Sequence, residues 1–248
     1  SDVLLTSWAV DHFSAGTSSQ GRGWNCGYRC MQVMTSALHT FPPLRSALFN
    51  GDGAVPSVRG LQAWIERAWG LGFDAKGAAE MGGRILGCDV WIGTSEYVAA
   101  FRQFGVPCRV VSFSSGEGGD PRVAASLLDW VWAYFETGTG DGLLARTHGR
   151  VKVRQSRRLP LILQHQGHSR VIVGIDKRLA PRDRDRDRDK RPTGLPPATH
   201  EKVLLLFDSS ASGRELATCL TRKKNWDNLK RTINSLSSKD KYELVVFE

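Results

Sequence analysis

The amino-acid sequence predicts an α+β fold, with a helical part followed by an antiparallel sheet. Apolar residues recur at helical spacing through the first half of the chain, and short runs of strand character are concentrated in the second half. No interior stretch resembles an interdomain linker. We therefore expect one domain over residues 1–248, with a well-covered core.

The first predicted helix begins at Cys26. Met31, Met34 and Leu38 recur on one face after it, and the Pro-Pro pair at 42–43 ends the element. Unpaired amides and the helix dipole at a helix start stabilise an anion, which lowers the pKa of a thiol placed there. Cys26 is therefore the candidate reactive cysteine, and Cys30, one turn further along, is expected to be buried.

The remaining elements follow from the same kind of pattern. Helices are expected where apolar residues recur every three or four positions, and strands where β-branched residues alternate with polar ones. Further helices are predicted at Val58 to Trp69, Ser95 to Phe104 and Leu127 to Phe135. Strands are predicted at Val106 to Phe113, Leu159 to Gln164, Ser169 to Ile175, Lys202 to Phe207 and Tyr242 to Phe247.

Two segments break these patterns. Gly138 to Arg158 is rich in Gly and then basic, which indicates an exposed loop or sheet edge. Arg and Asp alternate from Arg182 to Asp189, and a Pro-rich run follows to Pro197. Such a composition lacks the apolar residues that a core requires, so a disordered insert is predicted at about residues 178–200.

Charge and composition limit the partners. The net charge is +9 and the pI is near 9.6, which favours acidic partners, including nucleic acid through Gly149 to Arg158 and Arg222 to Arg231. The alternative is that this charge only promotes solubility. The longest apolar runs, such as Val203 to Phe207, are far shorter than the roughly 20 residues of a membrane span, so no membrane partner is expected.

The cysteine content indicates a reducing compartment. Five cysteines are few and odd in number, which argues against a disulfide framework. The first residues, Ser1 to Leu5, lack the pattern of a secretory signal, although a first residue other than Met suggests a fragment or a processed chain. We expect a cytoplasmic or nuclear monomer with no cofactor.

Two segments carry the candidate chemistry, Gly-Trp-Asn-Cys-Gly-Tyr-Arg at Gly23 to Arg29 and Gln-His-Gln-Gly-His-Ser-Arg at Gln164 to Arg170. A cysteine nucleophile needs a nearby imidazole, and a His about 130–150 residues after the Cys is the spacing of papain-like enzymes. His168 is a better base than His165, because it follows a Gly and opens an apolar strand.

The third member of such a site orients the imidazole. Asp208 ends the apolar run that pairs with the strand of His168, so a hairpin would place its carboxylate beside that ring. The backbone amide of Cys26 is one candidate oxyanion donor. Gln164 is the preferred side-chain donor, and Gln20 is the alternative by position.

Other interpretations of these residues remain open. A lone Cys or His is more often structural than catalytic, so the prediction depends on the conjunction of Cys26, His168 and Asp208. A zinc site of Cys26 and Cys30 with the two histidines is a weaker alternative, because the Cys-x3-Cys spacing is uncommon and no second Cys pair exists.

The chain resembles the ZUFSP family, zinc-finger-containing ubiquitin peptidases related to the proteases of the ubiquitin-fold modifier. The matching segments fall in family order and span nearly the whole chain: Gly23 to Arg29, Ile65 to Asp74, Trp91 to Glu96 and Leu163 to Arg170. In place of the family's Pro-Gly, Asp208 is followed by Ser209 and Ser210. The family's upstream zinc fingers and ubiquitin-binding helices are not among these residues.

The resemblance implies a deubiquitinase with a papain-like fold. It implies Cys26 as nucleophile, His168 as base, Asp208 as the orienting acid and Gln164 as oxyanion donor. It further implies that two carboxylates pair with the arginines of the ubiquitin tail and that two tryptophans cover its Gly-Gly. These residues are Asp74 and Glu96, and Trp24 and Trp91. Without the resemblance, an ordinary solvated carboxylate and a core tryptophan are the simpler interpretations.

The leading hypothesis is a thiol isopeptidase that cleaves after the Gly-Gly end of ubiquitin, from polyubiquitin chains. Three alternatives stay open: the same chemistry on the ubiquitin-fold modifier, a basic module that binds nucleic acid, and an inactive module that binds ubiquitin.

Overall fold

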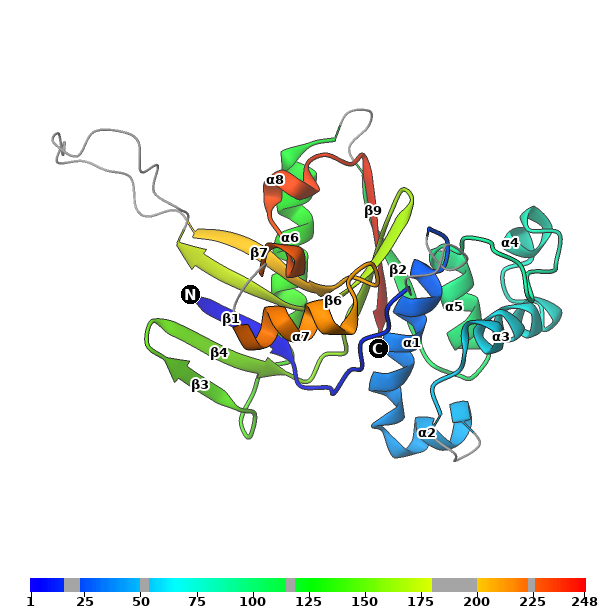
Figure 1. Ribbon diagram of the computed structural model, residues 1–248, viewed down its shortest axis with the longest axis horizontal. Coiled ribbons are helices and arrows are strands. Elements are labelled where there is room, and N and C mark those ends of the chain that lie inside the picture. The colour runs from blue at the N-terminus through cyan, green and yellow to red at the C-terminus, as the bar shows by residue number, and fades with distance from the viewer. Residues whose placement is uncertain (16–22, 50–53, 115–118, 180–199, 223–225) are drawn as a thin grey trace, which may run out of the picture.

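A mixed β-sheet forms the centre of the computed structural model, which describes residues 1–15, 23–49, 54–114, 119–179, 200–222 and 226–248 (Figure 1). The main strand order is β2-β9-β5-β6-β1-β4-β3, and β7 pairs with β6 and with β8. The strands are β1 (Asp2–Thr6), β2 (Cys108–Ser114), β3 (Ala145–His148), β4 (Val151–Ser156), β5 (Leu161–His165), β6 (His168–Leu179), β7 (His200–Phe207), β8 (Lys230–Arg231) and β9 (Lys241–Phe247).

Helices cover the two faces of this sheet. They are α1 (Cys26–His39), α2 (Pro42–Phe49), α3 (Val58–Gly70), α4 (Ala75–Glu80), α5 (Thr94–Arg102), α6 (Pro121–Glu136), α7 (Gly213–Arg222) and α8 (Ile233–Leu236), with the 3-10 helix η1 at Trp226–Leu229. Helices α1, α3 and α5 share one apolar core with Ile162, Val171 and Val245 of the sheet. Helix α6 packs on the opposite face, where Leu163 and Leu244 point. None of the helices described is long and apolar enough to cross a bilayer.

Strand β6 organises the sheet, because it pairs along both edges. One edge pairs with β7, from Val171 opposite Phe207 to Leu179 opposite His200. The other edge pairs first with β5 and then with β1, which begins opposite Lys177. Successive residues of β6 point to opposite faces, so the strand presents side chains to α1 on one side and to α6 on the other.

The predicted α+β class is confirmed, and so are the principal elements. The helix that begins at Cys26, the helices near Val58 and Ser95 and all five predicted strands are present, with ends displaced by a few residues. The predicted helix at Leu127 starts earlier, at Pro121, where the side chain of Asp120 caps the Arg122 N–H. The basic segment after Gly138 forms an edge hairpin of β3 and β4.

The sheet differs from the wholly antiparallel prediction in one place. Strand β1 runs parallel to β4, with Leu4 opposite Arg154, and lies between β4 and β6. The sequence pattern did not predict β1. Of the predicted disordered insert, Arg178, Leu179 and His200 belong to strands, and residues 180–199 lie outside the described residues.

Candidate active site

Helix α1 places Cys26 at its first position. Asn25 is the N-cap residue and makes no side-chain cap, so the first amides of the helix are not used by a capping side chain. Gly27 lets α1 approach its neighbours closely, because a Cβ there would collide with the Tyr97 hydroxyl and with Ile92. Cys30 is 2% exposed, as predicted, and belongs to the core. Cys26 is only partly buried, and its sulfur lies 4.0 Å from Ser169 Oγ on β6.

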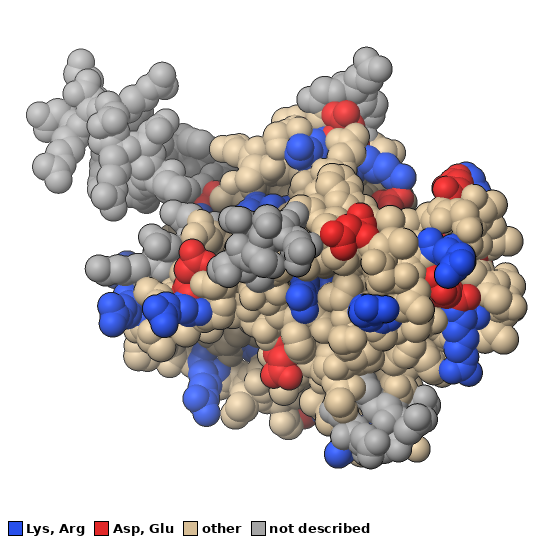
Figure 2. Space-filling model, turned by 45° about the vertical axis from the view of Figure 1, so that its right-hand side comes forward, with Lys and Arg blue, Asp and Glu red and all other residues tan. Residues whose placement is uncertain are grey.

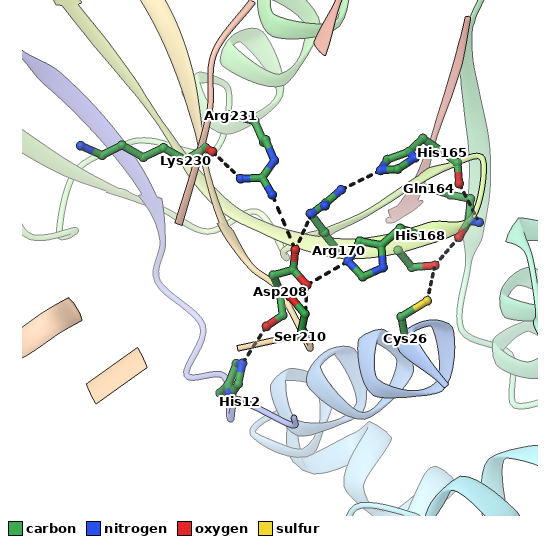
Figure 3. Close-up of polar contacts among 11 residues, drawn as sticks. His12, Cys26, Gln164, His165, His168, Arg170, Asp208, Ser210, Lys230 and Arg231 are labelled. Carbon is green, nitrogen blue, oxygen red and sulfur yellow. Dashed lines mark hydrogen bonds and ion pairs between the residues drawn. The ribbon is translucent and has the colours of Figure 1, made fainter. Parts of the chain in front are cut away.

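His168 follows a tight turn between β5 and β6. Gly167 supplies the left-handed backbone of that turn, with φ +78°. The His168 Nε2 atom lies 2.8 Å from Asp208 Oδ1, and the ring lies close enough to the Cys26 thiol to lower the pKa of that thiol. Since Nε2 meets the carboxylate, Nδ1 is the atom available to the thiol. The imidazole therefore lies between the sulfur and the carboxylate (Figure 3).

Asp208 is held by four residues at the end of β7, one of which is His168, and its side chain is only 7% exposed. Arg170 Nε donates to Oδ2 at 2.6 Å, and Arg231 Nη2 lies 3.7 Å from the same oxygen. The Ser210 N–H and hydroxyl donate to Oδ1 at 3.0 and 2.7 Å. Ser210 thus closes the turn at the position where the ZUFSP resemblance would have a Pro-Gly pair.

The protonation states favour an ion pair between Cys26 and His168. Burial raises the pKa of the Cys26 thiol, but hydrogen bonds from His168 and Ser169 and the charge of His168 outweigh it, so the net pKa falls. Burial lowers the pKa of His168, but the hydrogen bonds to Asp208 and Cys26 raise it to about 9. Burial likewise opposes ionisation of Asp208, yet His168 and Arg170 bring its pKa well below the usual range.

The side chain of Gln164 lies on the face of the sheet that α1 covers, near Cys26. Its Oε1 accepts hydrogen bonds from the hydroxyls of Ser169 and Tyr97, and its Nε2 donates to the His165 carbonyl at 3.2 Å. The Cys26 sulfur lies 4.0 Å from Ser169 Oγ, which brings Gln164 close to the thiol. The alternative donor, Gln20, lies outside the described residues.

His165 lies apart from the thiol. Its Nε2 meets Arg170 Nη1 at 2.7 Å, and its Nδ1 meets the Gln166 carbonyl at 2.9 Å. Because Arg170 is always charged and only donates, the ring is neutral, with Nδ1 protonated. Burial, followed by the charges of Arg170 and His168, lowers its pKa to about 4. Within the described parts of the chain, no cluster of His, Cys, Asp and Glu is arranged to hold a metal.

A cavity of about 520 Å³ extends from Gln164 toward α4. Asp74 lines it and caps α4, with Oδ1 accepting from the Gly77 N–H at 3.1 Å. Asp74 Oδ2 is buried and has no hydrogen-bond partner among the described residues. Glu96 is 5% exposed, and its Oε2 accepts from the Gly93 N–H at 2.6 Å. Both carboxylates reach the space that a Cβ on Gly77 would occupy, so they form a pair.

The two tryptophans have different surroundings. Trp91 is 56% exposed, and its ring lies 3.7 Å from the point that a Cβ on Gly167 would take. It therefore stands over the turn that precedes His168. Trp24 packs against the core and contacts Tyr28 edge to face at 5.5 Å between ring centroids. Of the pair, Trp91 is the residue exposed at the rim of the site.

Several residues of the site were not predicted from the sequence. Arg170 and Ser169 lie inside the histidine segment, so alternation along β6 would have placed them on opposite faces next to His168. Tyr97, Ser210 and Arg231 reach the site through tertiary contacts, for which the sequence gives no local signal.

A thiol at the start of a buried helix, beside an imidazole on a sheet, defines a papain-like cysteine peptidase. The family model described as peptidase family C78 matches residues 1–245. This chain belongs to that family. The resemblance to the ZUFSP family is also confirmed by its relatives.

Those relatives are longer proteins. A zinc finger-containing ubiquitin peptidase 1 of Mus musculus is 31% identical over 98% of this chain and 37% of its own length. Its Homo sapiens counterpart is 34% identical over 71% of this chain and 28% of its own length. The chain thus spans about a third of these relatives. A ubiquitin carboxyl-terminal hydrolase of Schizosaccharomyces pombe is 30% identical over 66% of this chain.

The fold is shared with a solved structure. The crystal structure of UfSP from C. elegans is similar with a TM-score of 0.56 over 99% of this chain and 34% of that chain, at 18% sequence identity. At this identity the likeness shows the fold alone, and it supports the papain-like architecture.

Proposed function

We propose that this chain is the catalytic part of a deubiquitinase, a thiol isopeptidase that cleaves polyubiquitin after the C-terminal Gly-Gly of ubiquitin. The observation that carries the proposal is the position of the His168 ring, which lowers the pKa of the Cys26 thiol on one side and is hydrogen-bonded to the buried Asp208 carboxylate on the other. The names of the relatives supply the substrate class.

The proposed reaction has two steps. The Cys26 thiolate attacks the carbonyl carbon of the terminal glycine, and His168 gives its Nδ1 proton to the departing lysine amine. A thioester to Cys26 remains. His168 then takes a proton from water, the hydroxide attacks the thioester carbon, and the C–S bond breaks to release the ubiquitin carboxylate. Asp208 fixes the ring and stabilises its charged form. The Cys26 amide and Gln164 Nε2 are the proposed oxyanion donors.

The acidic cavity supports recognition of the ubiquitin tail, which contains arginine before its Gly-Gly end. Asp74 Oδ2 is buried beside Glu96 and has no hydrogen-bond partner among the described residues, so it is an unused charged acceptor for a guanidinium that enters the cavity, and such charge-assisted bonds are among the stronger ones in proteins. The cavity runs from Asp74 to Gln164, near the thiol. We propose that Trp91 narrows the last part of that path so that only glycine passes, with Trp24 supporting it from the core side.

A ubiquitin probe with an electrophilic carboxyl end tests the proposal. The wild-type protein should form a covalent adduct, Cys26→Ala should form none, and Cys88→Ala should behave as wild type, because Cys88 is an exposed cysteine outside the site. Labelling of Cys26→Ala would contradict the assignment. A parallel probe of the ubiquitin-fold modifier separates the two modifiers, and ubiquitin binding without labelling would indicate the inactive module instead.

A panel of ubiquitin dimers and longer chains of each linkage then tests the polyubiquitin part of the proposal. Cleavage by the wild type, and none by Cys26→Ala, is the expected result. Labelling by the probe without cleavage of any chain would restrict the activity to other ubiquitin conjugates.

We propose a second candidate function, binding of nucleic acid, for the β3–β4 hairpin. Arg146, Arg150 and Lys152 are exposed on this edge hairpin, and the sequence from Gly142 to Ile175 contains no acidic residue. The second basic segment is less suited, because Arg231 is directed to Asp208. Figure 2 shows acidic and basic side chains interspersed over the face it displays, so the positive charge is not concentrated there.

Binding of a labelled oligonucleotide across a salt series tests this second function. Each of the changes Arg146→Ala, Arg150→Ala and Lys152→Ala should weaken binding and reduce the salt slope by about one. Arg154→Ala is not a suitable control, since Arg154 is paired with Asp2 at 2.9 Å within the sheet. Lys76→Ala, on exposed α4, is suitable. Salt-independent binding, or none, would rule the function out.

A further inference from the structure

Behind the thiol, two hydroxyl groups meet the side chain of Gln164. Ser169 is fully buried on β6, directly opposite Gln164 of β5, and Tyr97 is fully buried on α5. The Tyr97 hydroxyl lies 2.9 Å from Ser169 Oγ and 3.2 Å from Gln164 Oε1. Ser169 Oγ contacts Gln164 Oε1 as well, and it lies 4.0 Å from the Cys26 sulfur. The four side chains form one connected polar network.

We propose that Ser169 and Tyr97 form a hydroxyl relay that fixes the orientation of the Gln164 amide and donates a hydrogen bond to the Cys26 thiolate. Both are positioning residues, which act through Gln164 and Cys26. The part of the inference that concerns turnover rests on the proposed function. The part that concerns the Cys26 thiolate does not depend on which substrate the enzyme cleaves.

The hydrogen count of the network supports two arrangements. Each hydroxyl has one proton to donate, while Gln164 Oε1 and a thiolate only accept. With a neutral thiol, Ser169 donates to Gln164 and Tyr97 donates to Ser169. With a thiolate, Ser169 turns to the sulfur, and Tyr97 donates to Gln164 in its place. Rotation of the two hydroxyls therefore follows the charge of Cys26, and Gln164 Oε1 keeps a donor in both arrangements.

Tyr97 is suited to remain the donor at the end of the relay. Its burial raises the pKa of its hydroxyl well above the usual value, so the proton stays on the oxygen over the working range of the enzyme. The close approach of α1 at Gly27, whose missing Cβ leaves room for the Tyr97 hydroxyl, keeps this group beside the start of the helix. Tyr97 thereby links α5, the sheet and α1.

The relay also distinguishes the two ends of the Gln164 amide. Its oxygen accepts from two hydroxyls, and a flipped amide would instead place Oε1 beside the His165 carbonyl oxygen, where two acceptors would face each other without a proton between them. The Nε2 group is thus kept on the other side, where one of its hydrogens meets the His165 carbonyl at 3.2 Å. The second hydrogen remains for an oxyanion, and Gln164 lines the cavity proposed for the tail.

Site-resolved alkylation of Cys26 by iodoacetamide across a pH series tests the link to the thiolate. The exposed Cys88 serves as a reference in the same sample. Ser169→Ala should move the alkylation midpoint of Cys26 to higher pH and lower its rate at pH 7 by about tenfold, as expected for one hydrogen bond to a charged group. Ser169→Thr retains the hydroxyl and should restore the midpoint. An unchanged midpoint in Ser169→Ala would overturn this half of the proposal.

Turnover of a ubiquitin amide with a fluorogenic leaving group tests the link to Gln164. Tyr97→Phe should lower kcat by about tenfold with little change in KM, since the hydroxyl acts on the oxyanion donor. In the Gln164→Ala background, Tyr97→Phe should lower kcat little further, because the amide that the Tyr97 hydroxyl orients is absent. Equal losses in both backgrounds would show that Tyr97 is merely structural.

A matched variant separates this effect from the loss of any buried phenol. Tyr134→Phe removes a hydroxyl of α6 that donates to the Leu159 carbonyl at 3.0 Å, in the core on the opposite face of the sheet from α1. It should leave kcat and the alkylation midpoint of Cys26 unchanged. If the enzyme turns out not to cleave ubiquitin, the alkylation arm still stands, because iodoacetamide requires only the thiolate. Failure of the relay and failure of the substrate assignment are thereby distinguishable.

Discussion

The carboxylate of Asp208 is surrounded by hydrogen-bond donors, although its side chain is only 7% exposed. Ser210 supplies two donors, His168 a third and Arg170 a fourth. Arg170 is in turn held by His165, which is neutral and so accepts from it. A buried charge without such partners costs several kcal/mol. The orientation of the His168 ring therefore depends on a chain of contacts that reaches across the sheet.

The charge on His168 predicts a bell-shaped dependence of kcat/KM on pH. Below the lowered pKa of Cys26 the thiol regains its proton, and above about pH 9 the His168 ring loses its own, so activity should fall on the alkaline side near pH 9. Asp208→Asn removes a cause of the raised value. It should move the alkaline limb to lower pH and reduce kcat by about 10²–10⁴-fold. An alkaline limb that stays in place would contradict the role of Asp208.

At Gly77, a single methyl group should weaken substrate binding. A Cβ there would displace the carboxylates of Asp74 and Glu96. Gly77→Ala should raise KM for a ubiquitin substrate about tenfold while kcat changes little. Helix propensity favours Ala over Gly, so a general loss of stability would not be the cause. Gly70→Ala is the control, because a Cβ at Gly70 meets no atom within 4 Å; equal effects of the two changes would refute the explanation.

Among the elements, α3 determines where the segment before α5 lies. Glu66 Oε1 accepts from the N–H groups of Ile85 and Leu86 at 2.6 and 2.7 Å. Gln62 accepts from the Gly87 N–H at 2.9 Å and donates to the Cys88 carbonyl at 2.7 Å. Two side chains of one helix thus replace the strand or helix bonds that this irregular segment lacks. The segment leads directly to Trp91 at the site.

Removal of these bonds should loosen the segment without unfolding the protein. Glu66→Ala should lower the free energy of unfolding by about 1–3 kcal/mol, because it leaves two backbone donors unsatisfied, one of them on the buried Ile85. Hydrogen exchange should accelerate at 85–88 before it does in α1. Glu80→Ala removes only an exposed ion pair with Lys76 and should change neither. Uniform acceleration across the chain would contradict this local role.

The local sequence pattern was sufficient to predict most helices and strands and the pairing of β6 with β7, which places Asp208 beside His168. The strand order around Asp208 followed from hairpin pairing of β6 and β7, and the register brings Phe207 opposite Val171. Strand β1 was not predicted, because its partners, β4 and β6, lie far along the chain, so no hairpin turn beside it indicates a strand. Tyr97 was missed for a similar reason, since a buried tyrosine on a helix gives no sign of the strand residues it will meet.

At the scale of the whole molecule, the acidic cavity contrasts with a chain of net charge +9. Both lysines that line it among the described residues are neutralised locally, Lys76 by Glu80 at 3.7 Å and Lys241 by Glu243 at 2.6 Å. Asp74 has no such cation among the described residues. The local field at the tail cavity therefore differs in sign from the overall charge, and raising the salt concentration should weaken binding of a basic tail there.

The amino-terminal strand joins the edge hairpin to the rest of the sheet, and its loss should be felt globally. Leu4 is fully buried against α6, opposite Ile175 and Arg154 in the two neighbouring strands. Leu4→Ala should lower the free energy of unfolding in urea by about 2–5 kcal/mol through lost burial and the cavity left behind. Leu144→Ala, at a position that is 53% exposed, should lower the free energy of unfolding far less.

Because Leu4 belongs to the core on the side away from α1, the fraction of the Leu4→Ala protein that remains folded should still label with the ubiquitin probe at the wild-type rate. A slower labelling rate per folded molecule would mean that the two cores are coupled through the sheet. Strand β6 could carry that coupling, because it contains both Ile175, opposite Leu4, and His168.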